Sequence, residues 1–92
     1  MNTKANDLTE QSMNIASNLR RLRKSRKISL QKLSELSGVS YASLRRFEEI
    51  GEISLKSLIK IATVLDAADP LNNLFKDVEP KSIEELIRRN NG

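Results

Sequence analysis

The chain has 92 residues, a formal net charge of +4, and neither cysteine nor histidine. Disulfides and the usual zinc sites are therefore excluded, and so is any nucleophile paired with a histidine base. The sequence contains only three glycines, which leaves little room for a phosphate-cradling loop. We therefore expect no enzyme, no cofactor and no metal.

The length suits one compact domain with short tails. No apolar run approaches the roughly 20 residues that a membrane-spanning helix needs. The N-terminal segment, residues 1–9, is polar and lacks the apolar core of a signal peptide. These features predict a cytoplasmic protein with no membrane contact.

Basic side chains are concentrated in one third of the chain. Residues 14–46 hold nine Lys and Arg and one acid, whereas residues 47–92 hold six bases and nine acids. Such a basic segment is the footprint expected for a polyanionic partner. Charge alone is equally compatible with a solvated basic face.

A first helix is predicted from apolar residues at helical spacing: Ile15, Leu19 and Leu22. We assign residues 1–13 to an N-terminal arm, although the capping-box spacing of Asp7 and Glu10 allows the helix to start as early as Leu8. The solvent side of this helix is expected to carry four basic residues: Arg20, Arg21, Lys24 and Arg26.

Three serines mark the starts of the next three helices. Each hydroxyl can accept a hydrogen bond from a free backbone N–H, and each serine is flanked by an apolar pair that fixes the entry of the chain. The caps and their pairs are Ser29 with Ile28 and Leu33, Ser40 with Val39 and Leu44, and Ser54 with Ile53 and Leu58.

The second and third helices are close together in the sequence. The second is expected at about residues 30–37, and it ends at Gly38, which supplies a left-handed residue without steric cost. Only Gly38 and Val39 separate it from the cap of the third helix, expected at about residues 41–49. Two short helices joined by so short a turn are typical of a helix-turn-helix.

Two further helices are predicted before the tail. The fourth carries Leu55, Leu58, Ile61, Ala62 and Leu65. We expect Asp69 to cap a short fifth helix with Pro70 at its first position. The apolar residues of this fifth helix would be Leu71, Leu74 and Phe75.

The chain divides after this point into a domain over residues 14–76 and a tail over residues 77–92. Pro80 breaks the helical pattern, and Ser82 and Glu85 then have capping-box spacing before a second apolar run. The tail is therefore expected to form a short amphipathic helix, which packs either on the domain or on a partner.

A helical wheel separates the two sides of the third helix. Leu44, Phe47 and Glu48 lie on the inner side. The outer side carries Ala42, Arg45, Arg46 and Glu49, with Tyr41 at the margin. Arginine can bind guanine bidentately, tyrosine can bond a phosphate or pack on a thymine methyl group, and alanine can pack on that methyl group. The alternative is that these side chains merely face water.

Glu48 needs a partner if it is buried, because an unpaired buried carboxylate is costly. Arg23, near the end of the first helix, is the best candidate for an ion pair. The alternative is that Glu48 lies at a partly wet boundary.

Together these features resemble the Cro/CI-type (XRE) helix-turn-helix family. The resemblance covers residues 15–75 and rests on Leu19-Arg20-Arg21-Leu22-Arg23, Ser29 to Leu36, Gly38-Val39-Ser40, Leu44, Glu48 and Leu58 to Leu65. It implies an all-α, five-helix, lambda repressor-like DNA-binding domain over residues 14–76. The domain would bind DNA as a dimer with the third helix in the major groove.

The resemblance also assigns roles to individual residues. The base-contacting positions of the family are occupied by Tyr41, Ala42 and Arg46. Positions that contact the DNA backbone or flanking bases are occupied by Ser29, Ser40, Ser43 and Arg45, and Arg20 and Arg21 of the first helix are expected to bind phosphates. Arg23 and Glu48 match an internal ion pair of the family.

Two positions depart from the family pattern. Leu30 replaces a glutamine that often bonds the DNA backbone, which removes that contact. The loop after the third helix is one residue shorter, and its Glu52 adds an acid near the phosphates, which is expected to weaken non-specific binding.

A narrower resemblance concerns the segments 47–75 and 80–86, which are similar to HipB-type antitoxins encoded beside HipA-type kinases. Our main hypothesis is a homodimeric repressor or autoregulator that binds operator DNA. The alternative is a HipB-type antitoxin that also neutralises a HipA-like kinase toxin, in which the segment 81–91 or the acidic C-terminal half contacts the kinase.

Overall fold

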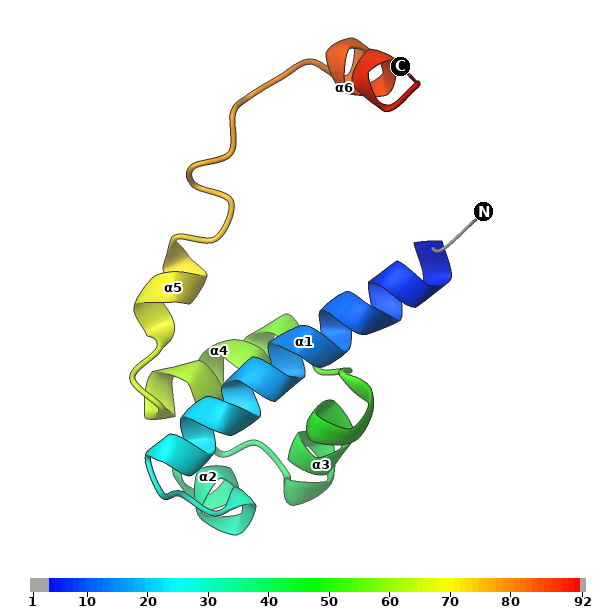
Figure 1. Ribbon diagram of the computed structural model, residues 1–92. Coiled ribbons are helices and arrows are strands. Elements are labelled where there is room, and N and C mark those ends of the chain that lie inside the picture. Colours follow the sequence, from blue (N-terminus) through cyan, green and yellow to red (C-terminus); the bar gives the residue numbers. More distant parts are fainter. Residues whose placement is uncertain (1–3, 92) are drawn as a thin grey trace.

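The computed structural model describes residues 4–91, and every regular element in that range is a helix (Figure 1). The six helices are α1 (Lys4–Ser25), α2 (Leu30–Ser37), α3 (Tyr41–Ile50), α4 (Leu55–Val64), α5 (Ala68–Asn72) and α6 (Ile83–Asn91). This range contains the five predicted helices, and the predicted tail helix is the sixth.

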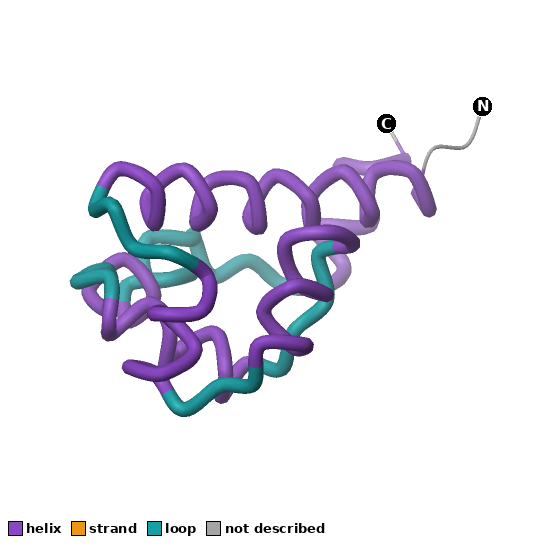
Figure 2. The backbone as a smooth tube through the Cα atoms, turned by 90° about the horizontal axis from the view of Figure 1, so that it is seen from below, coloured by secondary structure: helices purple, strands orange, loops and turns teal. Residues whose placement is uncertain are grey.

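Helices α1 to α4 surround one apolar core, and α5 packs on α4. Figure 2 shows α1 along one side of the domain, with the following helices packed beneath it. Contacts join α1 to α3, α2 to both α3 and α4, and α4 to α5. The core residues are Ala16, Leu33, Val39, Leu44, Phe47, Ile61 and Leu65. Each helix from α1 to α4 therefore contributes to the core at the spacing that the apolar pattern predicts.

The three serine caps are confirmed. Each serine has extended backbone angles, and its hydroxyl oxygen accepts a hydrogen bond from the backbone N–H three residues later. The donor–acceptor distances are 3.0 Å for Lys32 N to Ser29, 3.1 Å for Ser43 N to Ser40, and 3.1 Å for Ser57 N to Ser54. The starts of α2, α3 and α4 are thus fixed by residues inside the same turn.

Two serines of α2 hold the turn between α2 and α3 by bonding the backbone of Val39. Gly38 is left-handed, with φ of +78°. The hydroxyl of Ser34 donates to the carbonyl of Val39 over 2.6 Å, and the hydroxyl of Ser37 accepts from the N–H of Val39 over 3.1 Å. With Val39 buried in the core, these bonds fix the angle at which α3 leaves α2.

The turn between α3 and α4 is held differently. Gly51 is also left-handed, with φ of +77°, and it packs directly on α1. A Cβ atom at this position would lie 2.8 Å from Cβ and 2.9 Å from the carbonyl carbon of Ser12. The N-terminal half of α1 therefore supports this turn, which the sequence alone did not suggest.

The predicted start of the first helix is corrected by the structure. Helix α1 begins at Lys4, so that Asp7 lies in its first turn and not at an N-cap. An acid in the first turn is still favourable because it faces the positive end of the helix dipole. Much of the segment 1–13 that we assigned to an arm is continuous with α1, and residues 1–3 lie outside the described range.

The prediction for the fifth helix is wrong in two respects. The N-cap of α5 is Ala67, with no side-chain cap, and Asp69 lies inside the first turn. The helix starts early because Asp66 takes a left-handed φ of +60° and Ala67 N–H bonds the carbonyl of Ala62 over 2.8 Å. Leu74 and Phe75 were expected on the apolar side of this helix, but α5 ends at Asn72 and both side chains are exposed.

The end of α4 receives a further bond that the sequence did not predict. Arg26, expected on the solvent side of the first helix, donates from Nε to the carbonyl oxygen of Leu65 over 2.8 Å. A cation is favourable at a helix C-terminus, where the carbonyls lack partners. Arg26 therefore ties the end of α1 to the end of α4.

The tail forms the predicted helix, capped by Ser82, whose hydroxyl accepts from Glu85 N over 3.1 Å. Helix α6 stands apart from the rest of the molecule (Figure 1), and Ile83, Leu86 and Ile87 are exposed. The radius of gyration is consequently 16.1 Å, whereas a compact chain of this length has about 12 Å. Of the two arrangements that the sequence left open, packing on the domain is absent from the described residues.

The two left-handed glycines provide a matched test of the contact with α1. Gly38→Ala should lower the free energy of unfolding by about 1 kcal/mol, because only the left-handed backbone disfavours a Cβ there, and no atom lies within 4 Å. Gly51→Ala should cost about 1–3 kcal/mol more, because its Cβ meets Ser12. Urea denaturation of both variants measures the difference, and equal losses would contradict the close approach to α1.

Candidate nucleic-acid interface

The exposed side of α3 carries the residues expected to contact DNA bases. This outer face consists of Tyr41, Ala42, Arg45, Arg46 and Glu49, which together with Ile50 line an open hollow on the surface. The side chains of Arg45 and Arg46 are 55% and 63% exposed. On the opposite side of the helix, Leu44 and Phe47 are buried in the core, so the rotation of α3 agrees with the helical wheel.

Arg45 is paired within its own helix. Its Nη2 donates to Oε2 of Glu49 over 2.5 Å. This hydrogen bond and the charge of Glu49 are the main causes that raise the pKa of Arg45, with a smaller contribution from Tyr41. Arg45 is therefore a permanent cation whose guanidinium lies along the surface of α3.

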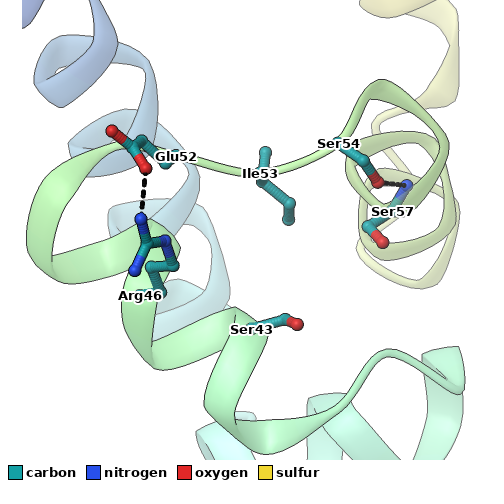
Figure 3. Close-up of a pocket in the computed structure, with 6 residues that line it drawn as sticks. All are labelled: Ser43, Arg46, Glu52, Ile53, Ser54 and Ser57. Carbon is teal, nitrogen blue, oxygen red and sulfur yellow. Dashed lines mark hydrogen bonds and ion pairs between the residues drawn. The ribbon is translucent and has the colours of Figure 1, made fainter.

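Arg46 is paired with the loop that follows α3. Its Nη2 donates to Oε1 of Glu52 over 2.6 Å (Figure 3). The pair borders an open hollow between α3 and the start of α4 that is lined by Ser43, Arg46, Glu52, Ile53, Ser54 and Ser57. Figure 3 shows Ser54 and Ser57 across this hollow from Arg46.

The predicted backbone-contacting serines lie at the exposed starts of α2 and α3. Ser29 and Ser40 each accept a backbone N–H, and Ser29 retains a hydroxyl hydrogen that can be donated. Ser40 donates to Ser43 over 2.9 Å, which leaves the hydroxyl hydrogen of Ser43 for another acceptor. Hydroxyl donors next to the positive end of a helix suit a phosphate group.

The two arginines of α1 that were expected to bind phosphates differ in their surroundings. Arg20 approaches α3, with Nε 3.6 Å from Oε1 of Glu48, and it lines an open hollow together with Leu30, Arg45, Glu48 and Glu49. Arg21 does not line this hollow; its Nη2 donates to Oδ1 of Asn18 on its own helix over 2.6 Å. The structure thus brings Arg20, but not Arg21, to the edge of the outer face.

Beneath the outer face, Arg23 and Glu48 form a bidentate ion pair. Nε of Arg23 lies 2.9 Å from Oε2 of Glu48, and Nη2 lies 3.1 Å from Oε1. Their side chains are 10% and 14% exposed. The pair joins α1 to α3 at positions 25 residues apart. Arg23 Nη1 also donates to the carbonyl of Ile28 over 2.8 Å.

Sequence reasoning did not place Glu52, Ser54 and Ser57 beside Arg46. Helical spacing relates residues three or four positions apart, and this spacing would have flagged the pair of Arg45 with Glu49. Glu52 reaches Arg46 across six positions, because the left-handed turn at Gly51 reverses the chain. The sequence signal for this contact is a glycine directly after a helix, which reverses the chain, followed at once by an acid.

The described residues offer neither a metal site nor a membrane span. Residues 4–91 contain no group of three or more acidic side chains that could hold a metal ion. None of their helices is long and apolar enough to cross a membrane.

The domain is all-helical, α2 and α3 form a capped helix-turn-helix, and α3 exposes two arginines. These features define a DNA-binding protein of the helix-turn-helix class. Comparison with protein families agrees: the Helix-turn-helix model HTH_3 matches residues 19–69, which is more than half of the chain. The chain belongs to this XRE-type family, and it is a DNA-binding transcription regulator. No curated protein and no solved structure matched it.

The ion pair beneath α3 can be tested through stability. Glu48→Ala should lower the free energy of unfolding by about 3 kcal/mol, because it leaves the charge of Arg23 buried without its partner. Glu35→Ala is the control: Glu35 and its partner Lys32 are 4.0 Å apart and each is 59% exposed, so the loss should stay within about 0.5 kcal/mol. Similar small losses in both variants, measured by chemical denaturation, would show that the pair is not buried in solution.

Proposed function

We propose that the protein is a homodimeric repressor or autoregulator that binds operator DNA with α3 in the major groove. The observation that carries this proposal is the outer face of α3, where Tyr41, Ala42, Arg45 and Arg46 are exposed together on a helix that is anchored from behind. A major groove admits an α-helix and presents a distinct donor and acceptor pattern for each base pair.

Base recognition is assigned to three residues. Arg46 binds O6 and N7 of a guanine through two of its N–H groups, which is the commonest specific contact of arginine. Ala42 packs on a thymine methyl group and allows close approach. Tyr41, at the N-terminal end of α3, contacts a base or the adjacent phosphate. The exposure of all three side chains supports this assignment.

Phosphate contacts position the domain without reading the sequence. We assign them to Ser29, Ser40, Ser43 and Arg45 at the starts of α2 and α3 and along α3, and to Arg20 and Arg21 of α1. The cap geometry supports the serines, and the place of Arg20 at the edge of the outer face supports its role. The domain over residues 14–76 would make all of these contacts.

A symmetric dimer requires a symmetric operator. The two copies of α3 would enter the major groove on two half-sites about 34 Å apart, which is one turn of DNA. Exposed apolar side chains such as Ile59, Leu74 and Phe75 support a protein partner for the domain.

A second candidate is a HipB-type antitoxin that also binds a HipA-like kinase. The specific observation in its favour is α6, an amphipathic helix that stands apart from the domain with Ile83, Leu86 and Ile87 exposed. An exposed apolar helix face is suited to a groove on another protein. The two functions are compatible, because DNA and kinase would use different parts of the chain.

Replacing Arg46 tests the reading face. Arg46→Ala should weaken binding to the preferred duplex by about 1–3 kcal/mol and relax the preference at one base pair, because the bidentate hydrogen bonds to guanine can no longer form. Fluorescence anisotropy on the preferred duplex and on its single-base variants measures both effects. Arg89→Ala, which removes the same charge from α6, is the matched control and should change neither.

The phosphate-binding residues respond differently. Arg20→Gln and Arg21→Gln should weaken binding to every duplex alike and reduce the slope of log K against log salt by up to about 0.9 for each phosphate that is no longer neutralised. Normal operator binding by Arg46→Ala, or an unchanged salt slope in both α1 variants, would overturn the proposed orientation on DNA.

Removing the tail separates the two functions. A chain truncated after residue 80 should bind the preferred duplex as the full chain does, because the outer face of α3 is untouched. It should fail to co-elute in gel filtration with a purified HipA-like kinase encoded by the adjacent gene. No capture of that kinase by the full chain would contradict the antitoxin function, whereas equal capture by the truncated chain would contradict the role of α6 alone.

A further inference from the structure

The ion pair between Arg46 and Glu52 differs from the other pair on the outer face of α3. Arg45 and Glu49 lie on the same helix, one turn apart. Glu52 lies in the loop after α3, and its 2.6 Å contact with Arg46 crosses from the loop back to the helix. Each of the two side chains remains more than 60% exposed, so both can be reached by a ligand that approaches α3.

The backbone at Glu52 is held by the residues on either side of it. Gly51 is left-handed and lies against Ser12 of α1 so closely that no Cβ would fit. On the other side, Ile53 packs against the core and Ser54 caps α4. The loop is thus held at both ends, and its backbone places Glu52 next to Arg46.

The contact occupies only part of the guanidinium. Glu52 is bound through Nη2, whereas arginine offers five N–H donors in a planar fork. The remaining donors can bind the neutral O6 and N7 atoms of a guanine while Glu52 keeps its place. A phosphate is different, because it brings a second negative charge to the same cation and is repelled by the carboxylate.

We infer that Glu52 is a specificity-determining residue that acts through Arg46, by disfavouring phosphates as ligands of this arginine while leaving guanine accessible. The inference rests on the proposed function, because it requires α3 to meet DNA. Phosphates are present in every duplex, whereas a guanine in register is present only at the operator. Glu52 therefore lowers the affinity for arbitrary DNA more than the affinity for the operator.

The test compares two duplexes and one substitution. The first duplex is the sequence that the wild-type chain enriches by in vitro selection, and the second is its scrambled version. Glu52→Gln removes the charge but keeps an oxygen that can accept from Arg46. It should strengthen binding to the scrambled duplex about fivefold at low salt, with a salt slope steeper by up to about 0.9. Binding to the selected duplex should change less than about twofold, so the ratio of the two affinities falls.

Two controls separate this effect from charge in general and from stability. Glu84→Gln makes the same change of charge on α6, away from the outer face of α3, and should leave the ratio of affinities unchanged. The thermal midpoint of Glu52→Gln should match that of the wild type, because the pair is exposed. The double variant Arg46→Ala, Glu52→Gln should bind the scrambled duplex as Arg46→Ala does, because Glu52 acts through Arg46.

The outcomes distinguish this inference from the function on which it rests. A wild-type chain that selects no sequence and binds no duplex overturns the proposed function. A wild-type chain that selects a duplex, but whose ratio of affinities is unaltered by Glu52→Gln, overturns only the role of Glu52. An equal gain on both duplexes, or an equal effect of Glu84→Gln, also overturns it, because the carboxylate would then act as general charge.

Discussion

The ion pair between Arg23 and Glu48 is the constraint on which the orientation of the outer face of α3 depends. Glu48 lies on the inner side of α3, where an unpaired carboxylate is costly, and Arg23 binds both of its oxygens from α1. Turning α3 about its axis would break this bidentate contact and withdraw Leu44 and Phe47 from the core. One charged pair and two apolar anchors therefore decide that the opposite side of the helix faces outward.

Much of this arrangement could be predicted from the sequence because it is local. A serine cap, the amide three residues later and a glycine after the last turn are related by fixed short spacings, so Ser29, Ser40 and Gly38 locate α2 and α3 correctly. The inner and outer sides of α3 follow from the period of the helix. A buried acid at position 48 needs a basic partner; Arg23, near the end of the first helix, was the best candidate, and the family resemblance agreed.

The parts that could not be predicted depend on backbone turns and contacts that helical spacing does not describe. The start of α5 shifts because Asp66 takes a left-handed conformation and Ala67 N–H bonds the carbonyl of Ala62. The preference of Asp69 for an N-cap position does not outweigh these two features. The length of α1 matters because Ser12 lies against Gly51, a contact between residues far apart in the chain. The partner of Arg46 was missed although it is only six residues away, because the reversal at Gly51 and not helical spacing brings Glu52 to it.

The distribution of charge along the chain is more informative than the net charge. Residues 14–46 carry a large basic surplus, which attracts any duplex regardless of its sequence. The two arginines on the outer face of α3 are each paired with a carboxylate, which reduces their share of this general attraction. Under the proposed function, the domain draws its long-range attraction from α1 and its selectivity from α3. The ratio of affinities, not the affinity itself, then determines which sites are occupied in a genome.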